Sequence, residues 1–558
     1  MRKRLLCGVL AILSACSVFG CGAATAAQIS ESRAIGYESR LFDSSFVHAI
    51  EVSIDDADWE DLKENPLDKT KYLADVTIDG ETIKGVSFST KGNTSLSFVA
   101  SDPESDRYSF KLNFGKFVEN QTYHGLDKLN LNNLYADATY LKDYLCYRLF
   151  EQSGVAAPLT SYVWLTVNGA PHGLYLAIEE IGESYLNRTR GGAGVLYKPE
   201  TEQLDNAKSA SNAGNPTDRD AQSGFTPSEG MIPPDGTPGD FTPSEGMTPP
   251  DRDAQSGFTP PEGMTPPDGT PGEFTSPEGM IPPGRDAQSG FTPPDGMQGG
   301  PGRPDAGSNG ADLVYSEDDL SSYSDIFDNA KTAVTDADKQ RVIAALKALS
   351  EQSGLSDVLD TDEIIRYFAA HNFVLNYDSY TGNMLHNYYL YENDGKLAML
   401  PWDYNLAFGA FGGASDVTGL LNTGIDTPLS GASEDARPMW AWIVKDDAYR
   451  SSYHAVFDEL LTAYFDSGVF SREVDALYEL LLPYVEADPT AFYTVEQYKT
   501  AVTSLKRFCL LRAESVRRQL DGSLSTDTEA QDAAQRIDAS DLDLSAMGSH
   551  GGAQRPQP

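Results

Sequence analysis

The sequence has few cysteines, and this limits the metal chemistry that it can support. Five cysteines occur in 558 residues, and only Cys146 and Cys509 lie beyond the N-terminal segment. No Cys-x-x-Cys pair and no cysteine and histidine cluster has zinc-site spacing. We therefore expect no zinc centre, and the two remaining thiols either pair with each other or stay buried and free.

Basic residues are also scarce. The chain has 42 Lys and Arg against 83 Asp and Glu, which gives a formal net charge of −41. Nucleic-acid binding depends on clustered Lys and Arg that neutralise phosphates, so a nucleic-acid partner is not expected. The length exceeds what one hydrophobic core needs, which predicts two lobes with irregular segments between or beside them.

Long apolar runs are absent after the N-terminus. Residues 1–27 combine a basic start, an apolar run and small residues, which is typical of an export signal. LSAC and VFGC, ending at Cys16 and Cys21, resemble a bacterial lipobox, whereas ATA at 24–26 suits ordinary signal cleavage. We expect an exported protein that is either secreted or held at the extracellular face of the membrane by lipid on Cys21 or Cys16. No later segment is apolar enough to cross a bilayer.

The part from 47 to 202 is predicted to be a β-rich lobe. Alternating apolar residues and Asx-Gly turns are typical of strands and hairpins. Strands are expected at 48–54 and 109–114, hairpins at 72–92 and 163–180 with turns at Asp79-Gly80 and Asn168-Gly169, and helices at 55–65 and 137–154.

The segment from 203 to 311 lacks the aliphatic residues that a stacked repeat core requires. RDAQSGFTP begins at 219, 252 and 285, a period of 33, in a background of Pro, Gly and acidic residues. This composition predicts a disordered insertion and not a solenoid. The repeated Phe and Met either bind a partner or belong to a plain spacer.

Helical periodicity returns from 312 to 520, with helices expected at 336–354, at 362–375 after the cap Thr361, and through 430–520. The polar, acidic end from 521 to 558 is expected to be a disordered tail. The fold class predicted is therefore α+β, with a β-rich N-terminal lobe and a helical C-terminal lobe interrupted by the insertion.

Three side chains in the helical half suggest phosphoryl transfer. Asp378 and Asn383 lie five residues apart in NYDSYTGN, and Asp403 follows an apolar strand in PWDYN. Phosphoryl transfer uses a carboxylate to orient the attacking hydroxyl, and amide and carboxylate oxygens to hold Mg²⁺ on the nucleotide. Protein kinases have the same order and Asp-x4-Asn spacing. The pattern predicts Asp378 as the catalytic residue and Asn383 and Asp403 as metal ligands.

Three lysines are candidate ATP-binding residues. Lys111 lies in the alternating strand YSFKLNF, as a kinase strand lysine does. Lys91 lies at a strand end beside a Gly-Asn-Thr-Ser turn whose backbone N–H groups can surround an anion. Lys198 in GVLYKPE is the third candidate. Of the adjacent Glu179 and Glu180, only one can face this site, because neighbouring strand residues point to opposite faces.

These motifs together resemble the CotH kinase family of spore-coat-type atypical protein kinases. The resemblance is carried by VSFSTKGNTS, YSFKLNF, VNGAPHGLYLAIEEI, NYDSYTGN and LPWDYNLAFG. It implies a divergent protein-kinase-like two-lobe fold, with ATP and Mg²⁺ or Mn²⁺ as cofactors. It also implies transfer to Ser or Thr of a surface or coat protein, the chain's own insertion included. Two departures are Ser89, where the family has arginine, and the insertion after Lys198.

A second hypothesis is a non-catalytic surface or coat-assembly scaffold or adhesin that uses the same fold for protein binding. Fold similarity alone does not separate the two hypotheses, since function depends on the site. The presence of Asp378, Asn383 and Asp403 together favours the enzyme. The histidines show no paired metal motif, and His371 is expected to be an ordinary core or surface residue.

Overall fold

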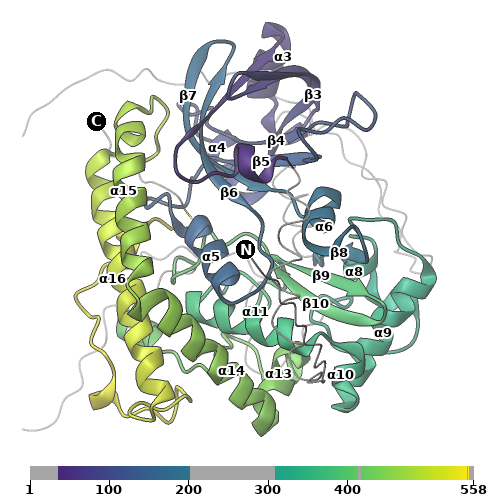
Figure 1. Cartoon of the computed structure of the whole chain (residues 1–558), viewed down its shortest axis with the longest axis vertical. Helices are drawn as coiled ribbons and strands as arrows, with labels where there is room; N and C mark the ends of the chain where they lie inside the picture. The colour runs from purple at the N-terminus through teal and green to yellow at the C-terminus, as the bar shows by residue number, and fades with distance from the viewer. Residues whose placement is uncertain (1–35, 202–307, 412–415, 550, 552–558) are drawn as a thin grey trace, which may run out of the picture. The chain divides into compact units, whose positions relative to one another are not determined.

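The computed structural model describes residues 36–201, 308–411, 416–549 and 551 (Figure 1). The predicted export signal with Cys16 and Cys21, nearly all of the insertion and the last seven residues lie outside the described residues. Within the described part of the chain, no helix has the length and apolarity needed to cross a membrane. Cys146 and Cys509 are both buried and free.

Seven strands in the first half close into a barrel, with neighbours in the order β1-β2-β3-β4-β5-β7-β6. The strands are β1 (His48–Ile54), β2 (Tyr72–Ile78), β3 (Glu81–Lys91), β4 (Ser109–Asn113), β5 (Lys128–Asn132), β6 (Thr160–Val167) and β7 (Ala170–Glu179). Alternate residues of β1 are buried and exposed, as a strand with one face on a core requires. The predicted hairpins at Asp79-Gly80 and Asn168-Gly169 are confirmed.

The closed barrel contradicts the predicted protein-kinase-like two-lobe fold, whose N-terminal lobe would carry an open sheet. Closure comes from parallel pairing of β1 with β6, in which Ile50 lies opposite Leu165. The other neighbouring strands of the barrel pair antiparallel. Pairing between strands so far apart in sequence leaves no mark on the alternation within either strand, so the strand pattern could not reveal it.

A second, three-stranded sheet has the order β10-β9-β8. It consists of β8 (Val195–Tyr197), β9 (Tyr388–Asn393) and β10 (Lys396–Pro401). Strand β8 precedes the insertion and pairs with β9, which follows it. The predicted lobe boundary at 202 therefore does not coincide with the boundary between the sheets. The turn at Asn393-Asp394-Gly395 joins β9 to β10 as predicted.

Helices make up most of the second half. Helices α9 (Asp336–Glu351) and α11 (Thr361–Val374) pack against β10, and α11 also contacts α5 (Lys142–Gln152) (Figure 1). The other helices before the insertion are α2 (Glu38–Leu41), α3 (Asp56–Glu64), η1 (Pro66–Asp68), α4 (Thr94–Ala100) and α6 (Glu183–Arg190). Those after it are η2 (Leu320–Tyr323), α8 (Ser324–Phe327), α10 (Leu355–Val358), α12 (Val417–Leu421), η3 (Glu434–Ala436), α13 (Pro438–Lys445), α14 (Asp447–Leu460), η4 (Leu461–Asp466), α15 (Val469–Ala487), α16 (Val495–Leu520), η5 (Ala533–Gln535) and η6 (Leu544–Met547).

A buried ion pair joins the barrel to the helical half. Both carboxylate oxygens of Asp488, which follows α15, accept hydrogen bonds from Arg107 Nη1, at 2.9 and 2.8 Å. Both side chains are fully buried. Gly173 of β7 makes room for the pair, because a Cβ atom there would lie 2.1 Å from Asp488 Oδ1.

Residues 521–549 include packed segments, whereas a disordered tail was predicted from 521 onwards. Leu542, Leu544 and Met547 are buried, and η6 packs on α16. The backbone of Met547 accepts a hydrogen bond from Ala138 N–H. These apolar side chains are too widely spaced among polar residues to predict a packed segment from periodicity.

Candidate active site

The turn that follows α11 is held in one conformation by its own residues and by a buried arginine. Leu375 ends the helix with a left-handed φ of +53°. Gly382 packs directly on the backbone of Tyr377, where a Cβ atom would lie 1.9 Å from the carbonyl oxygen. Arg437, which is fully buried, donates to the carbonyl oxygens of Tyr380 and Gly382, each at 2.7 Å.

Asp378 lies on this turn, and two residues directly before β9 orient it. Its Oδ1 atom lies 2.6 Å from His386 Nε2. Its Oδ2 atom accepts a hydrogen bond from Asn387 Nδ2 at 3.1 Å, and its carbonyl oxygen accepts from the same nitrogen at 2.9 Å. The Asp378 carboxylate is therefore fixed on both oxygens.

Asp403 follows β10 and has a left-handed φ of +56°, a conformation that Asp tolerates better than most residues. Its N–H donates to Tyr147 Oη at 3.1 Å. The amide of Asn376 joins the two aspartates, since Nδ2 donates to the Asp403 carbonyl at 3.3 Å and Oδ1 accepts from Asp378 N–H at 3.2 Å.

A cavity of about 860 Å³ contains both aspartates and all three predicted lysines, Lys91, Lys111 and Lys198. It is lined by lysines at positions 69, 71, 91, 111, 128, 198 and 331 and by acidic residues at 68, 137, 143, 180, 200, 378 and 403. In a chain of net charge −41, this balance of charges in one cavity is unusual. It provides cations for an anionic ligand beside carboxylates for a metal ion.

Lys111 and Glu180 form an ion pair of 2.7 Å in the wall of the cavity. Asn130 Nδ2 also donates to Glu180, at 2.5 Å. Burial by itself would raise the pKa of Glu180, but Lys111 and Asn130 outweigh it and lower the pKa to about 2. Glu179 instead contacts Arg188, so only Glu180 faces the cavity, as strand alternation predicts.

Two carboxyl groups of the cavity, those of Asp403 and Asp143, have pKa values above their ordinary range. Burial raises the pKa of Asp403, and Asp378 adds to the rise, while Lys91 and Lys198 offset part of it. Burial, followed by the charge on Asp403, also raises the pKa of Asp143. A bound cation would relieve this repulsion.

Among the described residues, no group of three or more His, Cys, Asp and Glu side chains is arranged to hold a metal ion. Mg²⁺ does not require such a group, because it is usually bound by one or two carboxylates together with substrate phosphates and water. Asp378, Asp403 and Asn387 line the cavity, and their side chains carry oxygens of the kind that Mg²⁺ prefers. The donor set therefore fits Mg²⁺ or Mn²⁺ bound together with a nucleotide.

Asn383, the predicted second metal ligand, is not brought to this cavity. It is exposed, does not line the cavity, and its side chain lies against Gly431. Asn387 occupies the place beside Asp378 instead. The asparagine that contacts Asp378 therefore lies nine positions after it in the sequence, and not five.

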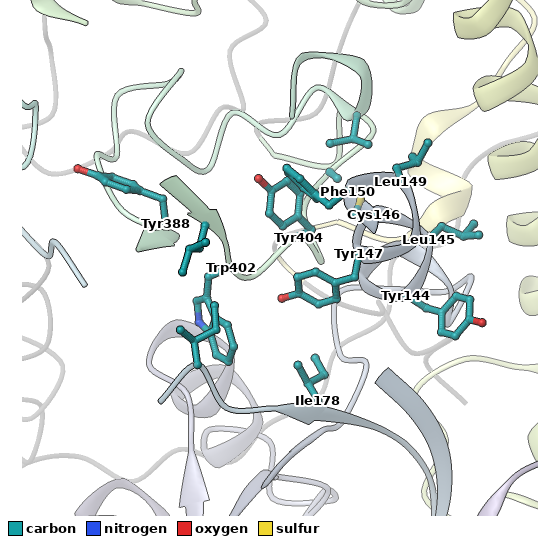
Figure 2. Packing of buried hydrophobic residues seen from close by; sticks show 14 of the residues in the cluster. Tyr144, Leu145, Cys146, Tyr147, Leu149, Phe150, Ile178, Tyr388, Trp402 and Tyr404 are labelled. Atoms are coloured by element: carbon teal, nitrogen blue, oxygen red, sulfur yellow. The ribbon is translucent and has the colours of Figure 1, made fainter. Parts of the chain in front are cut away.

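Two further residues at the site were missed by the sequence analysis. Asp143 of α5 accepts a hydrogen bond from Tyr404 N–H at 2.7 Å and supports the Asp403 turn. Figure 2 shows the neighbouring Tyr147 and Phe150 of α5 grouped with Tyr404. Asp143 lies off the apolar stripe of its helix, so periodicity gave no signal. One feature of the sequence could have indicated His386 as a site residue. It lies just before β9, the strand that follows Asp378.

Comparison with known proteins places these residues in a family. The model of the family described as CotH kinase protein matches residues 88–233 and 303–516. The inner spore coat protein H of Bacillus subtilis (strain 168) is 26% identical over 149 residues, which are 26% of this chain and 38% of that protein. An inner spore coat protein H-like protein of the same organism is 33% identical over 98 residues, 18% of this chain and 30% of its own length.

The matched regions thus span less than two-fifths of either relative's length. The family model covers more than half of this chain, including Lys91, Lys111, Asp378 and Asp403. The chain belongs to the CotH kinase protein family.

Proposed function

We propose that this protein transfers the γ-phosphoryl group of ATP to Ser or Thr side chains of a protein acceptor. The observation that carries the proposal is the single cavity in which the Lys111 and Glu180 ion pair lies together with Asp378 and Asp403. A lysine held by a glutamate, an aspartate for the acceptor hydroxyl and an aspartate for the metal are the parts that phosphoryl transfer requires.

Asp378 accepts the proton of the acceptor hydroxyl in this proposal. Its two carboxylate oxygens are already fixed by His386 and Asn387, so little reorientation is needed before reaction. Lys111, Lys91 and Lys198 bind the nucleotide phosphates. Asp403, with Asn387, would hold Mg²⁺ or Mn²⁺, which neutralises phosphate charge when it is bound.

The acceptor and the location of the protein are part of the proposal. We propose a surface or coat protein as the acceptor, in keeping with the names of the two relatives. The chain's own insertion is a second acceptor, because a covalent tether gives it a high effective concentration. We also propose export with lipid attached at Cys21 or Cys16. The mass of the mature N-terminus distinguishes a lipid anchor from simple cleavage.

The test is incubation of the purified protein with γ-labelled ATP, Mg²⁺ or Mn²⁺, and a mixture of surface proteins. Wild type is expected to label protein, and Asp378→Asn is expected to label none. Asp435→Asn is the matched control, because Asp435 is 95% exposed and does not line the cavity. Equal labelling by wild type and Asp378→Asn, or no labelling with either metal, contradicts the kinase and favours the scaffold.

A further inference from the structure

His371 connects the two turns that carry Asp378 and Asp403. It belongs to α11 and is 1% exposed. Its Nδ1 atom lies 2.8 Å from the hydroxyl of Tyr404, the residue after Asp403. Its Nε2 atom lies 2.7 Å from Thr381 Oγ1, on the turn of Asp378.

The hydroxyl of Ser379, the residue after Asp378, is a second partner of Nε2, at 3.1 Å. The imidazole therefore binds one turn through each of its nitrogens. His371 does not line the cavity, so it has no direct contact with a ligand there. His371 can therefore affect a reaction in the cavity only by positioning the two turns.

The hydrogen bonds also define which nitrogen carries the proton. The Ser379 hydroxyl donates to the carbonyl oxygen of Asn376 at 2.7 Å, so toward Nε2 it can act only as an acceptor. A hydrogen on Nε2 serves both the Thr381 and the Ser379 hydroxyl, and Nδ1 then accepts from Tyr404 O–H. This arrangement requires a neutral imidazole, which burial favours by lowering the pKa of His371 to about 3.

The ring itself is held in place. The ring of Tyr367, one turn earlier on α11, stacks on it with centroids 5.5 Å apart and an angle of 7° between the planes. A fixed ring with two fixed partners sets a distance between the two turns. Asn376 makes the inner connection between the backbones of Asp378 and Asp403, and His371 makes a second connection behind it.

We infer that His371 is a positioning residue that fixes Asp378 relative to Asp403 by binding both turns at once. The expected effect on turnover rests on the proposed function, whereas the expected effect on the two turns does not. Catalysis by positioning is sensitive to displacements of about 1 Å, which cost about 100-fold in rate. The loss of His371 should therefore reduce turnover more than it reduces nucleotide binding.

Four variants test the inference. His371→Phe keeps an aromatic ring and removes the hydrogen bonds to both turns. Thr381→Val removes the nearer partner on the turn of Asp378, and Tyr404→Phe removes the partner on the turn of Asp403. Asn372→Leu is the control, since Asn372 is the next residue of α11, is equally buried, and donates only to Tyr453 Oη, at 2.9 Å. If His371→Phe fails to fold, the two single-partner variants still test the connection.

The first readout is hydrogen exchange of backbone amides, which needs no activity. His371→Phe should accelerate exchange in both 376–382 and 402–406 by about tenfold, Thr381→Val mainly in the first segment, and Tyr404→Phe mainly in the second. Asn372→Leu should accelerate neither. Unchanged exchange in both segments in His371→Phe, or equal acceleration in the Asn372→Leu control, overturns the inference.

The second readout is steady-state phosphoryl transfer by the full-length protein. His371→Phe should lower kcat by about 10- to 100-fold while KM for ATP changes less than about twofold. Adding Thr381→Val or Tyr404→Phe to His371→Phe should cause no further loss, because the connection is already broken. Additive losses overturn the inference. If wild type transfers no phosphate, the proposed function fails, and the exchange readout alone decides the role of His371.

Discussion

The Lys111 ammonium lies 2.7 Å from the Glu180 carboxylate, across three neighbouring strands of a closed barrel. Lys111 belongs to β4, Glu180 directly follows β7, and β5 lies between them. Asn130 of β5 pairs with Lys111 in register and donates to the same carboxylate. The barrel therefore holds a cation in the wall of the cavity that contains Asp378 and Asp403.

Replacement of Lys111 should remove most of the activity. Lys111→Met removes the phosphate contact that the proposal assigns to this side chain, so kcat/KM for ATP is expected to fall by about 100-fold. Lys84→Met is the control, because Lys84 lies on the neighbouring strand β3 and is 82% exposed. Steady-state kinetics measure kcat/KM for ATP in the two variants. Equal activity of the two variants would show that Lys111 does not contact the phosphates.

The ion pair also predicts how stability depends on pH. The pKa of Glu180 is lowered from 4.5 to about 2 in the folded protein. A lowered carboxyl pKa stabilises the fold above the unfolded value, and this contribution disappears as the pH falls from 4.5 to 2. Glu180→Gln should therefore be less stable than wild type by about 3 kcal/mol at pH 7.

Urea unfolding measured at several pH values checks this prediction. The stability difference between wild type and Glu180→Gln should be constant above pH 4.5 and shrink toward pH 2. A difference that does not change across this range would mean that Lys111 does not stabilise the Glu180 carboxylate.

The two asparagines near Asp378 should behave differently. Asn387 binds the Asp378 carboxylate and lines the cavity, whereas Asn383 is exposed and lies outside it. We expect Asn387→Ala to lower kcat by about 100-fold and Asn383→Ala to change it less than about twofold. A rate assay at saturating ATP compares the two. A larger loss of kcat in Asn383→Ala than in Asn387→Ala would contradict this prediction and support Asn383 as the metal ligand, as the five-residue spacing predicts.

Local features of this chain could be predicted from sequence because they depend on near neighbours. The Asx-Gly turns at Asp79, Asn168 and Asp394 predicted three hairpins, and apolar periodicity predicted α11. Its cap was predicted wrongly, because Asp360 and not Thr361 caps the helix. Asp378 and Asp403 were recognisable because each follows a regular element at a loop. The structure brings both to one cavity.

Features that depend on distant pairing could not be predicted in this way. Barrel closure joins β1 to β6, and strand alternation is the same in an open and a closed sheet. The position of Asn387, and not Asn383, beside Asp378 depends on how the turn folds over Gly382. The role of His371 depends on two turns that meet only in the folded chain, so one histidine in a helical pattern gave no signal.

The buried pair of Arg107 and Asp488 should be a major source of stability. Arg107→Met leaves Asp488 as an unpaired charge in a fully buried position, which is expected to cost about 3–5 kcal/mol. Arg507→Met is the control, because Arg507 and Asp541 are exposed and such pairs contribute less than about 1 kcal/mol. Urea unfolding at pH 7 measures both. A loss below about 1 kcal/mol for Arg107→Met would contradict the prediction.

A crystal structure with a non-hydrolysable ATP analogue and Mn²⁺ would show whether the cavity binds nucleotide and metal as proposed. We expect phosphate oxygens in contact with Lys111 and an anomalous Mn²⁺ peak at the Asp403 carboxylate, with Asp378 facing the terminal phosphate. A nucleotide bound elsewhere on the protein, or a peak distant from Asp403, would contradict this expectation.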